Sequence, residues 1–98
     1  MAWASWTTVG IFAGPGGVRT EEIGIISGEV SVHTTWADGQ AEFAVQYSGS
    51  SDWFTLYGSP VACPGEEESR ELHQLVVDAV RAGGGATAPG AGPIVPAA

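Results

Sequence analysis

Apolar and polar positions alternate most regularly on either side of the dipeptide Asp38-Gly39. This alternation runs through residues 29–36 and 41–47, and it is the period of a β-strand with one buried face. Asp-Gly between two such segments predicts a hairpin, because a type I′ turn needs positive φ at both central residues. The register imposed by this turn places the following residues of the apolar face opposite one another: Trp36 and Ala41, Thr34 and Phe43, Val32 and Val45, Val30 and Tyr47.

A second hairpin is expected upstream, with a two-residue Ser-Gly turn at residues 27–28. That turn would place Ile25 opposite Val30 and Ile23 opposite Val32. The apolar face would then extend into a third strand.

Five strands are expected in all, since glycine, proline and serine clusters divide the chain into short β-favouring runs. The expected strands are Trp3–Ala13, Val18–Ile26, Glu29–Trp36, Ala41–Tyr47 and Trp53–Tyr57.

One amphipathic helix is expected from Pro64 to Ala82. Proline and three glutamates at residues 66–68 suit a first turn, and Gly83 is a typical stop. The apolar stripe of this helix consists of Leu72, Leu75, Val76, Ala79 and Val80. We expect it to cover the sheet face that carries Ile23, Ile25, Val30, Val32, Phe43 and Val45.

The fold class that follows is α+β, with an antiparallel sheet of about five strands and one C-terminal helix packed on one face. Residues 1–82 are expected to form a single domain. Residues 83–98 are rich in glycine, alanine and proline and are expected to be a flexible tail. If this tail is ordered, it should be held by the domain or by another chain.

The charge of the chain narrows the range of partners. The formal net charge is −8, with three arginines and no lysine, which argues against direct nucleic-acid binding and against docking on anionic membranes. It favours a basic protein partner, although acidity alone also serves solubility. One cysteine, no signal-peptide pattern and no membrane-length apolar run are consistent with a soluble cytoplasmic protein.

Candidate chemistry in the sequence is sparse. His33 is expected opposite Glu22 and diagonal to Glu42, an arrangement that could support acid-base chemistry but more commonly makes a solvated cross-strand pair. Cys63 and His73 show no local metal-ligand spacing. The glycine run at residues 14–17 lacks the lysine and the following helix of a phosphate loop. We therefore predict no catalytic residues, no metal and no cofactor.

The second face of the sheet is the better candidate for function. One helix cannot cover both faces of a five-stranded sheet, and exposed apolar patches with polar rims mark association sites. The alternative is that the N-terminal strand folds over this face and closes a small sandwich or barrel. The residues expected to bind a partner are Trp53, Phe54, Leu56 and Ile26, with His33, Glu22 and Glu42 at the polar edge.

The function expected from these features is that of a non-enzymatic protein-interaction module, which self-associates into a homo-oligomer and docks to a larger protein. Two alternatives remain open. One is a structural accessory component of a large assembly, such as a phage capsid or tail. The other is an acidic regulator or inhibitor that occupies a basic site on its target.

Overall fold

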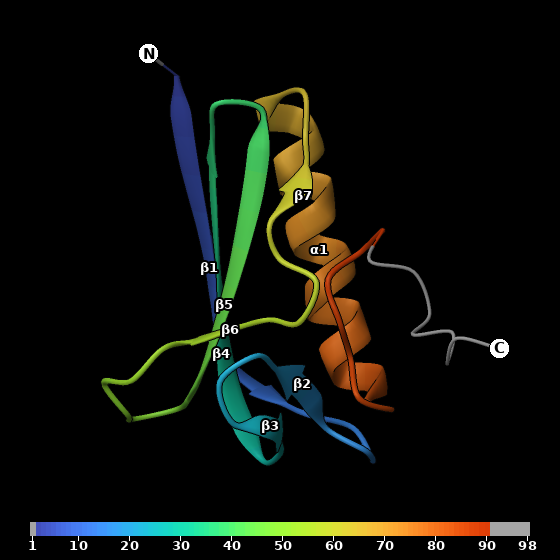
Figure 1. The fold of residues 1–98 in the computed structure, drawn as a ribbon. Coiled ribbons are helices and arrows are strands. Elements are labelled where there is room, and N and C mark those ends of the chain that lie inside the picture. The colour runs from blue at the N-terminus through green and yellow to red at the C-terminus, as the bar shows by residue number, and fades with distance from the viewer. Residues whose placement is uncertain (1, 91–98) are drawn as a thin grey trace, which may run out of the picture.

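Seven strands and one helix succeed one another along residues 2–90, the part of the chain that the computed structural model describes (Figure 1). They are β1 (Trp3–Phe12), β2 (Val18–Thr20), β3 (Gly24–Ile26), β4 (Glu29–Ala37), β5 (Gln40–Tyr47), β6 (Phe54–Thr55), β7 (Val61–Ala62) and α1 (Glu66–Ala82). Strands β1, β4, β5 and β6 lie side by side in that order in the main sheet, where β7 also pairs with β5. The predicted α+β class, with an antiparallel sheet of about five strands and one C-terminal helix, is confirmed.

The β4–β5 hairpin has the predicted turn and register. Asp38 and Gly39 have φ angles of 52° and 76°, the positive values that a type I′ turn requires. Thr34 lies opposite Phe43 and Val32 opposite Val45, as the alternation predicts. The hairpin therefore presents one apolar face to the core and one polar face away from it.

The expected pairing of residues 18–26 with β4 is wrong. The neighbour of β4 is β1, with Thr8 opposite Val32 and Ile11 opposite Val30. The N-terminal strand thus joins the edge of the main sheet and does not fold over its second face.

Residues 18–26 instead form a separate two-stranded sheet, β2–β3. The Thr20 hydroxyl closes its turn by donating to the Gly24 carbonyl oxygen at 2.7 Å and accepting from the Ile23 N–H at 3.2 Å. This short hairpin reverses which isoleucine is buried: Ile26 is 1% exposed, whereas Ile23 and Ile25 are 52% and 54% exposed.

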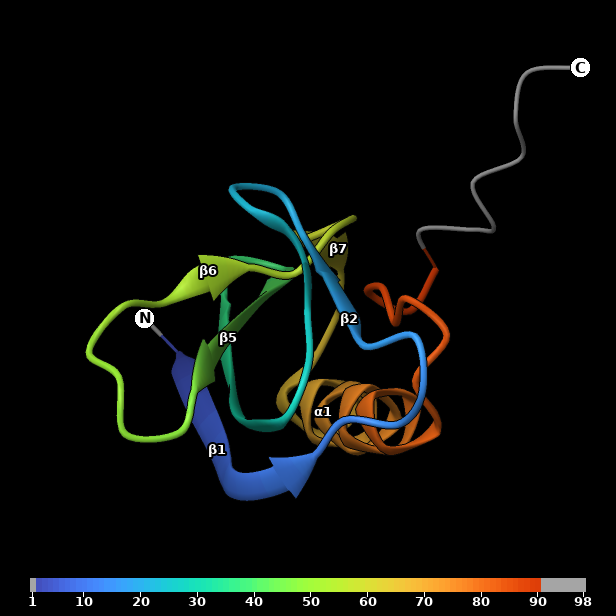
Figure 2. The same ribbon diagram turned by 90° about the horizontal axis from the view of Figure 1, so that it is seen from below.

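Helix α1 packs across β1 and β4, and the β2–β3 hairpin lies on the same side of the main sheet (Figure 2). The buried side chains of the helix are Ser69, His73, Val76, Val77 and Val80. Leu75, which the predicted stripe included, is 53% exposed. The helix is rotated relative to the predicted stripe, so that Ser69 and His73 face the sheet, because the sheet supplies polar partners for both. Trp6 Nε1 donates to Ser69 Oγ at 3.0 Å, and both ring nitrogens of His73 are hydrogen-bonded to threonine hydroxyls.

The glycine run at residues 14–17 packs against the carboxyl end of α1. A Cβ atom on Gly14 would lie 2.4 Å from the Arg81 carbonyl oxygen, and one on Gly83 would lie 2.3 Å from the Pro15 carbonyl oxygen, so neither position has room for a side chain. The carboxyl end of a helix carries partial negative charge, which is the wrong sign for binding phosphate. The glycines here serve close backbone packing.

Residues 83–90, the first part of the expected tail, lie against the domain. The Ala86 N–H donates to the Gly17 carbonyl oxygen, the Arg19 N–H donates to that of Ala86, and the Ala88 N–H donates to that of Tyr57. Ala86 and Ala88 are both buried. The rest of the expected tail, residues 91–98, lies outside the described residues.

Candidate functional site

The side of the main sheet that faces away from α1 carries the polar half of the strand alternation, and we call it the open face. It consists of Trp3, Ser5 and Thr7 from β1, His33, Thr35 and Ala37 from β4, and Gln40, Glu42 and Ala44 from β5, with Thr55 of β6 beside Ala44. The residues of the hydrophobic core lie on the other side of the sheet. Figures 1 and 2 show α1 on that side.

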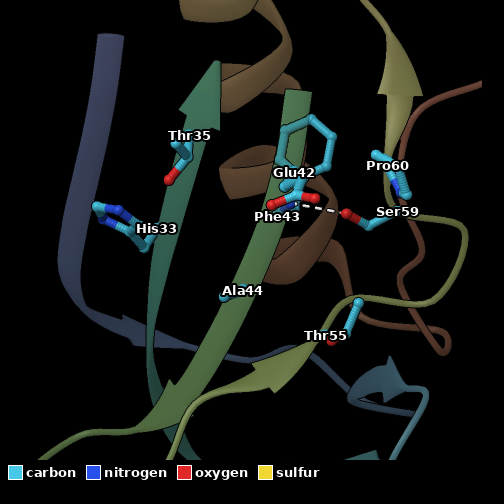
Figure 3. Close-up of a pocket in the computed structure, with 8 residues that line it drawn as sticks. All are labelled: His33, Thr35, Glu42, Phe43, Ala44, Thr55, Ser59 and Pro60. Carbon is cyan, nitrogen blue, oxygen red and sulfur yellow. Dashed lines mark hydrogen bonds between the residues drawn. The ribbon is translucent and has the colours of Figure 1, made fainter. Parts of the chain in front are cut away.

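A groove of about 190 Å³ lies on the open face. Its lining residues are His33, Thr35, Glu42, Phe43, Ala44, Thr55, Ser59 and Pro60. Figure 3 shows His33 on one side, Ser59 and Pro60 on the other, and Glu42 between them. A second hollow of about 200 Å³ shares Thr35 and Glu42 and continues over Ala37, Asp38 and Gln40 toward the hairpin turn. The two hollows follow the β4–β5 hairpin along its length.

His33 is the aromatic lining residue of this groove, and Trp53 packs against its ring. The ring centroids lie 5.8 Å apart with the planes tilted by 57°, a normal aromatic contact. His33 Nδ1 is hydrogen-bonded to Thr7 Oγ1 at 2.7 Å, which fixes the orientation of the half-buried imidazole. Trp53 retains 44% of its surface exposed, so part of this large apolar ring is available for contact.

Glu42 and Ser59 form the polar side. Glu42 lies opposite Thr35 in the β4–β5 register and is exposed to solvent. Ser59 is held against β5 at the side of the groove, because its hydroxyl oxygen accepts the Phe43 N–H at 2.8 Å. The groove therefore offers an exposed carboxylate, hydroxyls and the imidazole of His33.

Glu22 does not lie opposite His33, contrary to the sequence-based register, because it belongs to the turn between β2 and β3. Its carboxylate instead accepts the Thr55 N–H and the Thr55 hydroxyl, each at 2.7 Å. The hydroxyl bond is the main reason that the pKa of Glu22 lies below its usual value. Glu22 thereby ties the small hairpin to Thr55, which lines the groove.

The apolar part of the predicted binding patch is largely internal. Leu56 and Ile26 are 0% and 1% exposed and belong to the core, and Phe54 is half-buried against it. The cause is again the separate β2–β3 hairpin, since Leu56 bridges to Thr20 and is thereby enclosed. The expectation that Leu56 is a surface contact is wrong, and a charge introduced there would lie in the core.

Two further candidates for chemistry are occupied by structural contacts. The buried Cys63 thiol donates to the Gly65 carbonyl oxygen at 3.3 Å, and burial raises its pKa, which disfavours the nucleophilic thiolate. His73 is bonded to Thr8 and Thr34 at 2.8 and 2.7 Å, and burial lowers its pKa. Within residues 2–90 no three His, Cys, Asp or Glu side chains gather where they could hold a metal ion.

Of the seven predicted binding residues, the structure brings His33, Glu42 and Trp53 to one surface and joins Glu22 to it through Thr55. Ile26 and Leu56 lie in the core, and Phe54 packs against it. The residues that sequence reasoning missed are Thr55, Ser59 and Pro60. They reach the groove because the chain returns along β5, and no local pattern signals that return. Thr35 and Ala44 are different, since the hairpin register alone places them on the same face as His33.

Comparison with protein-family models, curated proteins and solved structures gives no match to this chain. For the described residues, the single helix is too short and too polar to cross a membrane.

Proposed function

We propose that this protein is a non-enzymatic protein-interaction module, which self-associates and docks to a larger protein through the groove on its open face. The observation that carries the proposal is that the side of the sheet opposite α1 bears a groove lined by the exposed carboxylate of Glu42 and by His33, whose ring contacts the exposed Trp53. Tryptophan is enriched among the residues that dominate binding energy at protein interfaces.

The groove chemistry favours an extended protein segment with a basic side chain. Glu42 lines both hollows and so lies at the centre of the path along the hairpin. Asp38 lies at the far end of the same path. In a chain of net charge −8, both carboxylates add to a field that attracts cationic partners. We therefore expect an arginine or lysine of the partner beside Glu42 and an apolar group against Trp53.

The test is a pull-down from native-host lysate with four immobilised proteins: wild type, Glu42→Gln, Glu71→Gln and Trp53→Ala. Glu71 is exposed on α1, on the other side of the sheet, so its variant removes the same charge away from the groove. Captured proteins are quantified by mass spectrometry at two salt concentrations. We expect the Glu42 variant to lose about tenfold in the capture of its main partner, as for a charge-assisted hydrogen bond.

Equal capture by the Glu42 and Glu71 variants would contradict the proposed groove. Complete loss of capture at high salt for both variants would instead favour the acidic regulator, which acts through its overall charge. For the assembly alternative, the order of residues 83–90 gives no support, because the domain itself holds them.

A further inference from the structure

Strand β1 is a long edge of the main sheet. It spans ten residues, pairs with β4 on one side, and lies at one end of the strand order β1-β4-β5-β6. Within residues 2–90 no strand pairs with its other side. A regular stretch of such an edge is a template for pairing with another strand.

The backbone groups that point out from this edge can be identified from the hydrogen bonds of β5. The Phe43 N–H donates to Ser59 Oγ, and the Phe43 carbonyl oxygen accepts from the Leu56 N–H, so the backbone groups of Phe43 point away from β4. Its partner Thr34 must then direct its own groups toward Trp6 of β1, because bonded and non-bonded pairs alternate in antiparallel sheets.

The same alternation determines the rest of the strand. Since Trp6 faces β4, its neighbours Ser5 and Thr7 direct their N–H and carbonyl groups to the free edge, as does Trp3. The register shift between Thr8 and Ile11 interrupts the strand only after this segment. Residues 3–8 therefore offer a regular row of unpaired donors and acceptors.

The features that usually protect an edge are missing from this segment. Natural edges are protected by charged residues such as lysine, by prolines or by bulges, whereas residues 2–18 contain no charged side chain, no proline before Pro15 and no register shift before Thr8. Three large apolar side chains are exposed along β1: Trp3 at 66%, Val9 at 73% and Phe12 at 71%. Because two copies of a chain with net charge −8 repel each other, the uncharged β1 edge is where they can approach at least electrostatic cost.

We propose that two copies of this protein pair antiparallel through β1, about a two-fold axis perpendicular to the sheet. The register that uses the outward backbone groups and the exposed apolar side chains places Trp3 opposite Val9 of the second copy. Ser5 then lies opposite Thr7, and the two Trp6 residues face each other at the axis. This is an isologous contact, in which each copy contributes the same surface.

This dimer rests on the self-association proposed above, and it identifies the β1 edge as the surface through which two copies associate. Because the axis is perpendicular to the sheet, both helices lie on one side of the joined sheet and both open faces on the other. The dimer then presents two grooves in one direction, and a partner with two basic segments gains affinity by engaging both.

The experiment compares the sedimentation equilibrium of wild type with that of the double variants Ser5→Lys/Thr7→Lys and Gln74→Lys/Ala82→Lys. In the proposed register the first variant sets lysines opposite lysines across the axis, which is destabilising. Gln74 and Ala82 are exposed on α1, so the second variant changes the net charge equally away from the edge. We expect the dimer dissociation constant to rise at least about tenfold in the first variant and not in the second.

Amide hydrogen exchange gives a second measurement that does not depend on substitution. The Ser5 and Thr7 amides should exchange more slowly at concentrations where the wild type is dimeric, whereas the Trp6 amide, bonded to β4, should be protected at all concentrations. A wild type that stays monomeric at every concentration would overturn both self-association and this surface. A dimer with unprotected Ser5 and Thr7 amides, or one that survives in the lysine variant, would overturn the β1 surface alone.

Discussion

Replacing Ile26 with alanine and, separately, its neighbour Ile25 tests which side of β3 faces the core. Ile26 is 1% exposed and packs in the core, whereas Ile25 is 54% exposed. Truncating a buried isoleucine to alanine costs about 2–5 kcal/mol, because apolar contacts are lost and a cavity remains. A surface substitution usually changes stability by less than about 0.5 kcal/mol. The two substitutions are chemically identical, so their difference reports burial alone.

The assay is urea unfolding followed by tryptophan fluorescence. A domain of this size has a total stability of about 5–15 kcal/mol, so Ile26→Ala removes a large fraction of it. With a denaturant slope of about 2 kcal/mol/M, the middle of the usual range, the midpoint should fall by about 1–2.5 M for Ile26→Ala and hardly move for Ile25→Ala. A larger loss for Ile25→Ala would refute the separate β2–β3 hairpin and restore the register in which Ile25 faces Val30.

Three further predictions concern polar contacts. Burial lowers the pKa of His73 from 6.5, so the unfolded chain binds a proton at a higher pH than the folded chain does. The contribution of His73 to stability should be complete above pH 6.5 and should be lost as the pH falls below it. In urea unfolding compared from pH 7.5 to 5.5, the stability of His73→Gln should therefore depend less on pH than that of the wild type. Trp36→Phe removes the 3.0 Å bond from Nε1 to the Cys63 carbonyl oxygen and should cost about 1–3 kcal/mol in the same assay, and an unchanged midpoint would contradict it. In Thr55→Val the carboxylate of Glu22 loses its hydroxyl donor, so its NMR titration midpoint should move up toward 4.5, and an unmoved midpoint would exclude this bond as the main cause.

The parts of the fold that the sequence predicts are those set by local chemistry. The turn at Asp38-Gly39 determines the β4–β5 register, because positive φ and a period of two leave one consistent alignment. The position of α1 follows equally from its glutamate-rich start and its glycine stop.

The parts that the sequence does not predict depend on contacts between distant segments. Ser27-Gly28 is compatible with a tight hairpin, but a threonine hydroxyl at residue 20 closes a shorter one, and β1 takes the vacant place beside β4. The helix face turns toward His73 because Thr8 and Thr34 satisfy its ring nitrogens, a gain that hydrophobic periodicity does not register.

The candidate site shows the same division. The hairpin register alone places His33 and Glu42 on one polar face, and both line the groove. The sequence pattern also places Ile26 and Leu56 on that face, but both are buried, because residues 18–26 pair with each other and not with β4. A one-residue change in strand pairing moves a side chain to the opposite face, so errors in pairing become errors in the site.

The most direct test of the proposed binding face is an NMR titration of the labelled protein with the main partner recovered by the pull-down. The amide shifts should concentrate at His33, Glu42, Thr55 and Trp53, on the open face. Shifts concentrated on the exposed side of α1 around Leu75, with the open face unchanged, would contradict the proposed binding face.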